Sequence, residues 1–243
     1  MKPFALRSAL QVLLPAALLI AGCSKKDEPA PTPAPDQGKV MFINAASHVS
    51  TLTLKFLVDN SEKASLAYGA NSGYQGISTG SRSVQVTSGS QSALTQAITV
   101  VKDKNYTFVS APAPTTATVN GFLFADDLNA PAATKAKIRV INLGENLSTP
   151  VRLSQVTAVP GAAIIVPDVA GSAASPFVEF TPGNNYSLVV ADNTNTTLAS
   201  LGDGSGSGMG TKNFEAGKIY TVVLSGTSGS LTNGLKVYLT QNN

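Results

Sequence analysis

Two copies of one sequence pattern run through this chain, and the repeat restricts its fold more than any other feature. The first copy begins at Lys39 with KVMFINAASHVST, and the second begins at Lys137 with KIRVINLGENLST. Later in each copy, KNYTFV from Lys104 matches KIYTVV from Lys218, and the matched segments keep the same order. Because a repeated pattern encodes the same unit twice, we expect two similar domains in tandem.

Apolar and polar residues alternate within each copy, as they do in strands that bury one face. Clear examples are residues 52–56, 83–86 and 235–239. Turn signals such as residues 58–60 and 182–184 separate the alternating stretches, and no long helical period is present. With about a hundred residues per copy, the pattern predicts an all-β chain of two tandem immunoglobulin-like or transthyretin-like β-sandwich domains.

The second copy contains an additional glycine-rich run, GDGSGSGMGTKN, at residues 202–213. This run lacks the Gly-Lys-Ser/Thr of a phosphate-binding loop and the repeated aspartates of a calcium-binding loop. We therefore expect an enlarged hairpin loop, and the sequence assigns no role to residues 202–210.

The start of the chain has the order of a secretory signal. Lys2 and Arg7 precede an apolar run that is too short for a membrane-spanning helix and that Pro15 would interrupt. The sequence IAGC at the end of this run resembles the lipobox of bacterial lipoproteins. The resemblance implies that residues 1–22 are removed and that Cys23, the only cysteine, becomes a lipidated N-terminus. Two or more acyl chains hold a protein stably on a bilayer.

The segment that follows predicts a spacer and suggests a location. Ser24 stands where the inner-membrane retention signal of such lipoproteins carries Asp, and residues 24–28 resemble the charged segment of Bacteroidota lipoproteins. The resemblance implies an outer-membrane lipoprotein, and we further expect that it is displayed at the cell surface. Residues 29–38 are rich in proline, which favours an extended chain of roughly 3.1 Å per residue.

These features divide the chain into five segments. We expect a signal peptide at 1–22, a lipidated cysteine and proline-rich linker at 23–38, a first β-sandwich repeat at 39–130, a linker at 131–136, and a second, more divergent repeat at 137–243.

The first copy also resembles a known family. Its Ile-Asn-Ala strand end, the Leu-Ala-Tyr-Gly stretch that includes Tyr68, the later Tyr74 and the KNYTFV strand are similar to the bacterial domain of unknown function 4397 family (DUF4397). The resemblance extends over nearly all of residues 39–240 and is weaker in the second copy, which lacks the Tyr68-Gly69 pair. It implies a secreted or anchored β-sandwich and brings no established activity and no catalytic residues.

Few residues offer catalytic or metal-binding chemistry. His48 is the sole histidine, so histidine clusters for a metal are excluded, and a Ser-His-Asp triad would have to use it. We interpret His48 as a surface residue. The adjacent Asp126 and Asp127 could contribute oxygen ligands to a cation, but two ligands do not make a site, and we interpret them as the solvated end of a strand. We predict no catalytic, cofactor-binding or metal-binding residues, and no cofactor besides the covalent lipid on Cys23.

Two tyrosines remain as candidate ligand-facing aromatics. Tyr68 and Tyr74 could each stack on a sugar or a peptide, because tyrosine combines a broad face with a polar tip. The alternative is packing, which we favour for Tyr74 because Phe177 stands in the corresponding place of the second copy.

Composition narrows the function further. The net charge of +3 includes two basic residues of the leader, so the remainder is nearly neutral and no nucleic-acid partner is expected. We expect a non-enzymatic binding, adhesion or structural module that is attached to the membrane by its lipid and whose partner is an unknown envelope protein or glycan. A carbohydrate-binding accessory lipoprotein is the alternative, although the chain has no tryptophan. A hydrolase with a dispersed site is the poorest fit.

Overall fold

The computed structural model describes residues 35–47, 53–89, 91–113, 118–155, 163–184, 186, 188–201, 212–232 and 234–243. The leader, Cys23, His48 and the loop at 202–210 lie outside these residues. The chain from Pro35 to Asn243 forms one compact unit. Over the described ranges the chain forms strands and no α-helix, which confirms the all-β prediction. None of the described segments is a helix long and apolar enough to cross a membrane.

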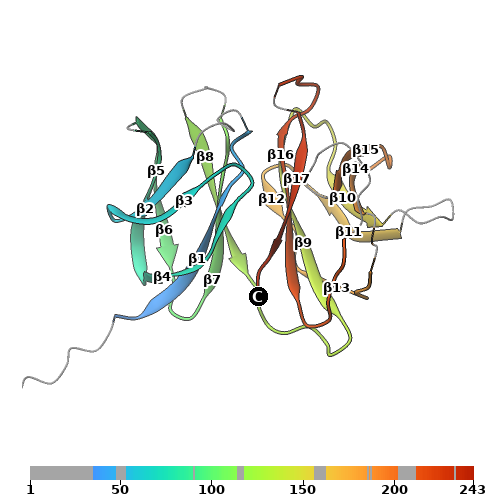
Figure 1. The fold of residues 1–243 in the computed structure, drawn as a ribbon, viewed down its shortest axis with the longest axis horizontal. Helices are drawn as coiled ribbons and strands as arrows, with labels where there is room; N and C mark the ends of the chain where they lie inside the picture. The colour runs from blue at the N-terminus through green and yellow to red at the C-terminus, as the bar shows by residue number, and fades with distance from the viewer. Residues whose placement is uncertain are drawn as a thin grey trace, which may run out of the picture. The chain divides into compact units, whose positions relative to one another are not determined.

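The first copy folds into two four-stranded sheets (Figure 1). Sheet A has the strand order β4-β1-β7-β8, and sheet B has the order β3-β2-β5-β6. In chain order the strands are β1 (Gln37–Asn44), β2 (Leu54–Val58), β3 (Ser61–Leu66), β4 (Asn71–Ser78), β5 (Gly80–Ser88), β6 (Gln91–Val100), β7 (Asn105–Pro112) and β8 (Val119–Asp126).

The second copy repeats this topology (Figure 1). Sheet C has the order β12-β9-β16-β17, with β13 also paired to β9, and sheet D has the order β11-β10-β14-β15. The strands are β9 (Ala136–Glu145), β10 (Val151–Gln155), β11 (Ala163–Val169), β12 (Ala173–Ala174), β13 (Val178–Phe180), β14 (Leu188–Asp192), β15 (Thr197–Leu201), β16 (Ile219–Thr227) and β17 (Lys236–Gln241).

The strand registers show that the two copies are structurally equivalent. In the first, β1 runs parallel to β7 with Lys39 opposite Asn105. In the second, β9 runs parallel to β16 with Lys137 opposite Ile219. The matched sequence segments therefore occupy matched positions in the central strand pair of sheets A and C.

Each copy has its own core between its two sheets. In the first, the rings of Phe42, Phe56 and Phe108 lie 5.4–6.4 Å apart, and all three are fully buried. In the second, Phe214 packs edge-on against Phe180 and Tyr220. Burying one such side chain contributes about 1.5–3 kcal/mol, so these aromatic clusters stabilise the sandwiches without tryptophan.

Strands β1 and β9 are buried on both faces, whereas a strand of a sheet with one wet surface buries only one face. Val40 and Phe42 of β1 face the first core, whereas Met41 and Ile43 belong to a separate apolar cluster. That cluster also contains Ile141 of β9. Sheets A and C therefore pack against each other through their outer faces.

Candidate functional site

The candidate site is the junction where sheet A meets sheet C. Its apolar part draws on the same positions of both copies, including Ile43 with Ile141 and Val109 with Val223. The full set of buried apolar members is Met41, Ile43, Ala45, Val109, Ala111, Ile141, Leu143 and Val223. A junction of this kind resembles a domain core more than a surface contact.

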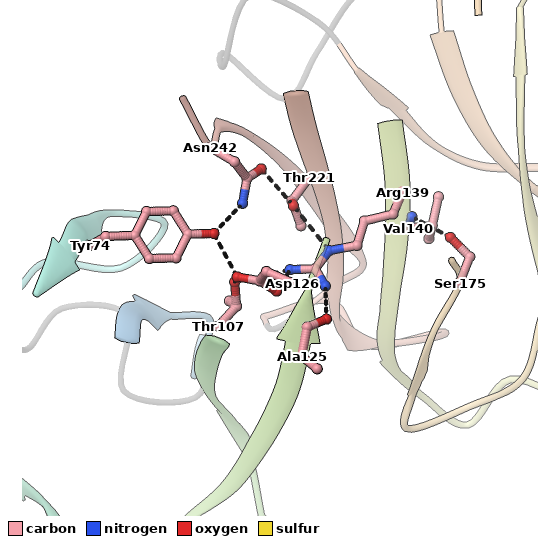
Figure 2. A network of polar contacts seen from close by, with 9 residues as sticks. All are labelled: Tyr74, Thr107, Ala125, Asp126, Arg139, Val140, Ser175, Thr221 and Asn242. Atoms are coloured by element: carbon pink, nitrogen blue, oxygen red, sulfur yellow. Dashed lines mark hydrogen bonds and ion pairs between the residues drawn. The ribbon is translucent and has the colours of Figure 1, made fainter. Parts of the chain in front are cut away.

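A buried ion pair lies beside this apolar cluster. Nη2 of Arg139, on β9, is 2.6 Å from Oδ1 of Asp126, at the end of β8, and their side chains are 1% and 0% exposed. The guanidinium also donates to the carbonyl of Ala125 at 3.2 Å, to Oγ1 of Thr107 at 2.9 Å and to Oγ1 of Thr221 at 3.1 Å. Figure 2 shows these bonds converging on the guanidinium from both copies.

The carboxylate of Asp126 completes a ring of polar contacts (Figure 2). Its Oδ2 accepts hydrogen bonds from Thr107 at 2.7 Å and from the hydroxyl of Tyr74 at 2.5 Å. Asn242 donates to that hydroxyl at 3.0 Å and accepts from Thr221 at 2.8 Å. Among the described residues Oδ1 accepts no hydrogen bond, so the guanidinium charge at 2.6 Å is what balances it. Buried charges are tolerated when they are paired and hydrogen-bonded in this way.

The environment of Tyr74 keeps its hydroxyl protonated. Burial raises the pKa of Tyr74 well above its ordinary value, and the neighbouring Asp126 carboxylate raises it further. Because the phenol stays neutral, it can donate to the carboxylate while it accepts from Asn242. Along the ring, each donor therefore meets an acceptor, from Thr221 and Asn242 of the second copy through Tyr74 to Asp126.

The two adjacent aspartates have different environments. Asp127 is 53% exposed and pairs with Lys137 at 3.0 Å, and the hydrogen bond from Lys137 is the main cause of its lowered pKa. Asp126, in contrast, is sequestered in the junction. The prediction of a solvated strand end was therefore wrong for Asp126, because the packing of sheet C on sheet A removes that side chain from water. Among the described residues no group of three or more His, Cys, Asp or Glu side chains could hold a metal ion.

Tyr68 lies at another part of the same junction. Its ring meets Tyr238 of β17 edge-on at 5.2 Å, and Nζ of Lys236 lies 5.4 Å from its centroid. Its hydroxyl is 3.5 Å from Oγ of Ser225. Both aromatic candidates thus contact the second copy. A role of either ring in holding a ligand stays a prediction.

A cleft of about 690 Å³ opens beside the ends of β7 and β8. Its wall combines charged, amide and aromatic groups, including Asp103, Lys104, Tyr106, Asp127 and Asn129. Groups of this kind can hydrogen-bond a polar ligand and stack on it.

Arg139, Thr221 and Asn242 are junction residues that sequence reasoning missed. A signal was present for the first of them: Arg139 interrupts the apolar strand IRVI at the place where the first copy has Met41. A charge inside an otherwise apolar strand indicates a buried partner. The partner itself could not be found, because it follows from the packing of two sheets.

Comparison with known proteins adds one finding. No curated protein matches the chain. The resemblance predicted from the sequence covered both copies, whereas the observed match covers the first copy and extends through β9 of the second. Residues 38–149 match the model of the family described as Domain of unknown function (DUF4397), and this stretch includes both Asp126 and Arg139.

Proposed function

We propose that this chain is a lipid-anchored, non-enzymatic module of the cell envelope that presents two β-sandwiches as one rigid body to an envelope protein or glycan. The observation that carries the proposal is the buried junction between sheets A and C. Its Arg139–Asp126 pair and apolar cluster join the sandwiches where a flexible linker alone would leave them independent.

The sequence supports the proposed anchor and spacer. Cys23 in its lipobox context supplies the lipid attachment, and the proline-rich residues from Pro29 to Asp36 serve as the spacer before β1, which begins at Gln37. Ser24, in place of the Asp of an inner-membrane retention signal, supports an outer-membrane location, and the resemblance of residues 24–28 to the charged segment of Bacteroidota lipoproteins supports display at the cell surface.

Rigidity suits a display or spacing role. Ordering two domains against each other during partner binding would cost conformational entropy, and a preformed junction removes that cost. The partner would contact loops and outer sheet faces, because binding residues on sandwich scaffolds concentrate on loops.

A carbohydrate-binding accessory lipoprotein is the second candidate, and the cleft at the ends of β7 and β8 favours it. Asp103, Asn105, Asp127 and Asn129 are the planar polar groups that hydrogen-bond sugar hydroxyls, and Tyr106 offers an aromatic face. This candidate shares the anchor and differs in the ligand.

The anchor is tested by cell fractionation. Cys23→Ser is expected to move the protein from the membrane to the soluble fraction, whereas the matched control Ser24→Ala stays with the membrane. Membrane association of the Cys23→Ser variant would contradict the proposal. Surface display is tested separately by protease treatment of intact cells, and a chain that remains whole would exclude it.

The partner is sought by crosslinking on living cells and identification of the attached molecule. Recovery of an envelope protein or glycan supports the binding module. A glycan array probed with residues 35–243 distinguishes the second candidate: specific signal that Asp127→Ala reduces supports it, and an array without signal excludes it.

A further inference from the structure

The two faces of the junction are built from equivalent positions that carry different charges. Met41 of β1 lies opposite Thr107 of β7, and Arg139 of β9 lies opposite Thr221 of β16. The threonine is the same in both copies. The residue beside it is apolar in the first and cationic in the second.

The acidic member of the pair differs in the complementary way. Asp126 lies opposite Asn105 at the end of the β7–β8 pair. Asn242 occupies the same position after β17, because its backbone amide donates to the carbonyl of Ile219, the counterpart of Asn105, at 2.8 Å. The first copy therefore carries a carboxylate where the second carries a neutral amide.

These differences decide which faces can pair. When sheet A meets sheet C, Arg139 meets Asp126 and both charges are compensated. If two sheet A faces from different chains met, two Asp126 carboxylates would be buried with Met41 in place of an arginine. If two sheet C faces met, two Arg139 guanidiniums would be buried against Asn242. An uncompensated buried charge is strongly unfavourable, so both homotypic pairings are disfavoured.

We propose that Arg139 and Asp126 are specificity-determining residues that restrict the junction to pairing of sheet A with sheet C and exclude pairing of two like faces from different chains. The apolar cluster draws on equivalent positions of both copies, as the two halves of an isologous dimer interface do, so apolar burial alone does not distinguish the pairings. The connection through residues 127–135 raises the effective concentration of the correct pair. The ion pair adds discrimination that the connection alone does not provide.

Substitutions that copy the opposite repeat test this proposal. Arg139→Met copies Met41, and Asp126→Asn copies Asn242. Residues 24–243, which retain the whole compact unit, are prepared with an affinity tag or with a fluorescent label, unfolded, mixed and refolded together. The labelled chain that co-purifies with the tagged chain measures pairing between chains.

We expect little co-purification for the wild-type chain. For the Arg139→Met/Asp126→Asn variant we expect an increase of about tenfold or more, because a small decrease in the free-energy difference between correct and homotypic pairing changes their ratio tenfold. Each single variant permits one homotypic pairing and is also expected to increase co-purification. The control Lys55→Met/Glu62→Gln removes an ion pair whose side chains are 51% and 47% exposed, and it should behave as the wild type does.

Two results would overturn the proposal. One is a folded double variant that co-purifies no more than the wild type. The other is a double variant that does not fold. Both new residues already occupy the equivalent positions of the other copy, so the proposal requires that the double variant folds. The midpoint of thermal unfolding separates these results, and we expect the double variant to lie closer to the wild type than Arg139→Met alone.

Discussion

Gly69 of the first copy lies directly against the ring of Tyr238 in the second, so that a Cβ added to Gly69 would come within 2.6 Å of Cε1 of Tyr238. Gly69 also has a φ of +80°, a conformation that side chains rarely adopt. The glycine of the Tyr68-Gly69 pair thus allows the turn after β3 to approach the second copy.

The first prediction concerns this contact. Gly69→Ala should lower the free energy of unfolding by about 2 kcal/mol, because it combines backbone strain with overpacking against Tyr238. Gly73→Ala is the matched control: its φ is +63°, but a Cβ there would meet nothing within 4 Å. Urea unfolding of both variants measures the difference. Equal losses would show that the approach to Tyr238 does not limit residue 69.

The second prediction concerns the asparagine shared by both copies. Nδ2 of Asn44 donates to the carbonyl of Leu66 at 3.0 Å, and Nδ2 of Asn142 donates to that of Val169 at 3.1 Å. Each Oδ1 also accepts from the amide two residues later, and both side chains are fully buried. The repeated asparagine therefore ties the first strand of each copy to the last residue of a strand in the facing sheet, β3 in the first copy and β11 in the second.

Replacing either asparagine with alanine should cost about 1–3 kcal/mol, because buried backbone groups lose their partners. The two losses should be similar in urea unfolding. The exposed Asn184→Ala serves as the control and should change stability by less than about 0.5 kcal/mol. A loss at Asn44 or Asn142 no larger than at Asn184 would contradict this reading of the repeat.

The fold was more predictable from the sequence than the junction, for a physical reason. Alternation and the matched segments specify which residues share a strand face, and the equivalent registers of Lys39 and Lys137 follow from them. The continuous apolar run VMFI in β1 indicates burial on both faces. It does not name the surface that covers the second face. The pairing of Arg139 with Asp126 depends on the packing of two sheets, which no local pattern encodes.

The third prediction concerns alkaline pH. Burial, and then Asp126, raise the pKa of Tyr74 in the folded protein, and burial, and then Tyr68, raise that of Tyr238. A raised folded pKa contributes stability that is fully present below the unfolded value of about 10 and is lost as pH rises toward the folded pKa. The free energy of unfolding should therefore fall with pH above about 10.

Tyr74→Phe and Tyr238→Phe test this dependence. Each should make the alkaline decline shallower, by at most about 1.4 kcal/mol per pH unit and by less where solvent screens the phenol. Urea unfolding at several pH values between about 8 and 11 gives the slope. A slope unchanged in both variants would show that these phenols ionise alike in the folded and unfolded chain.

The fourth prediction is that the two sandwiches unfold together. Phe56 lies in the core of the first sandwich. Phe56→Ala should lower the free energy of unfolding by about 3–5 kcal/mol, because it opens a cavity in that core. Because sheets A and C share a buried cluster, loss of the first sandwich exposes Ile141 and Val223 and leaves Arg139 without Asp126. In hydrogen-exchange experiments the backbone amides of β9 and β16 should therefore lose protection as well as those of β1 and β7.

Leu153→Ala, in the second core, is the reciprocal variant, and it should reduce the protection of backbone amides in the first copy. If each substitution reduces protection only in its own sandwich, the junction does not couple their unfolding, and the rigid-body proposal loses its structural basis.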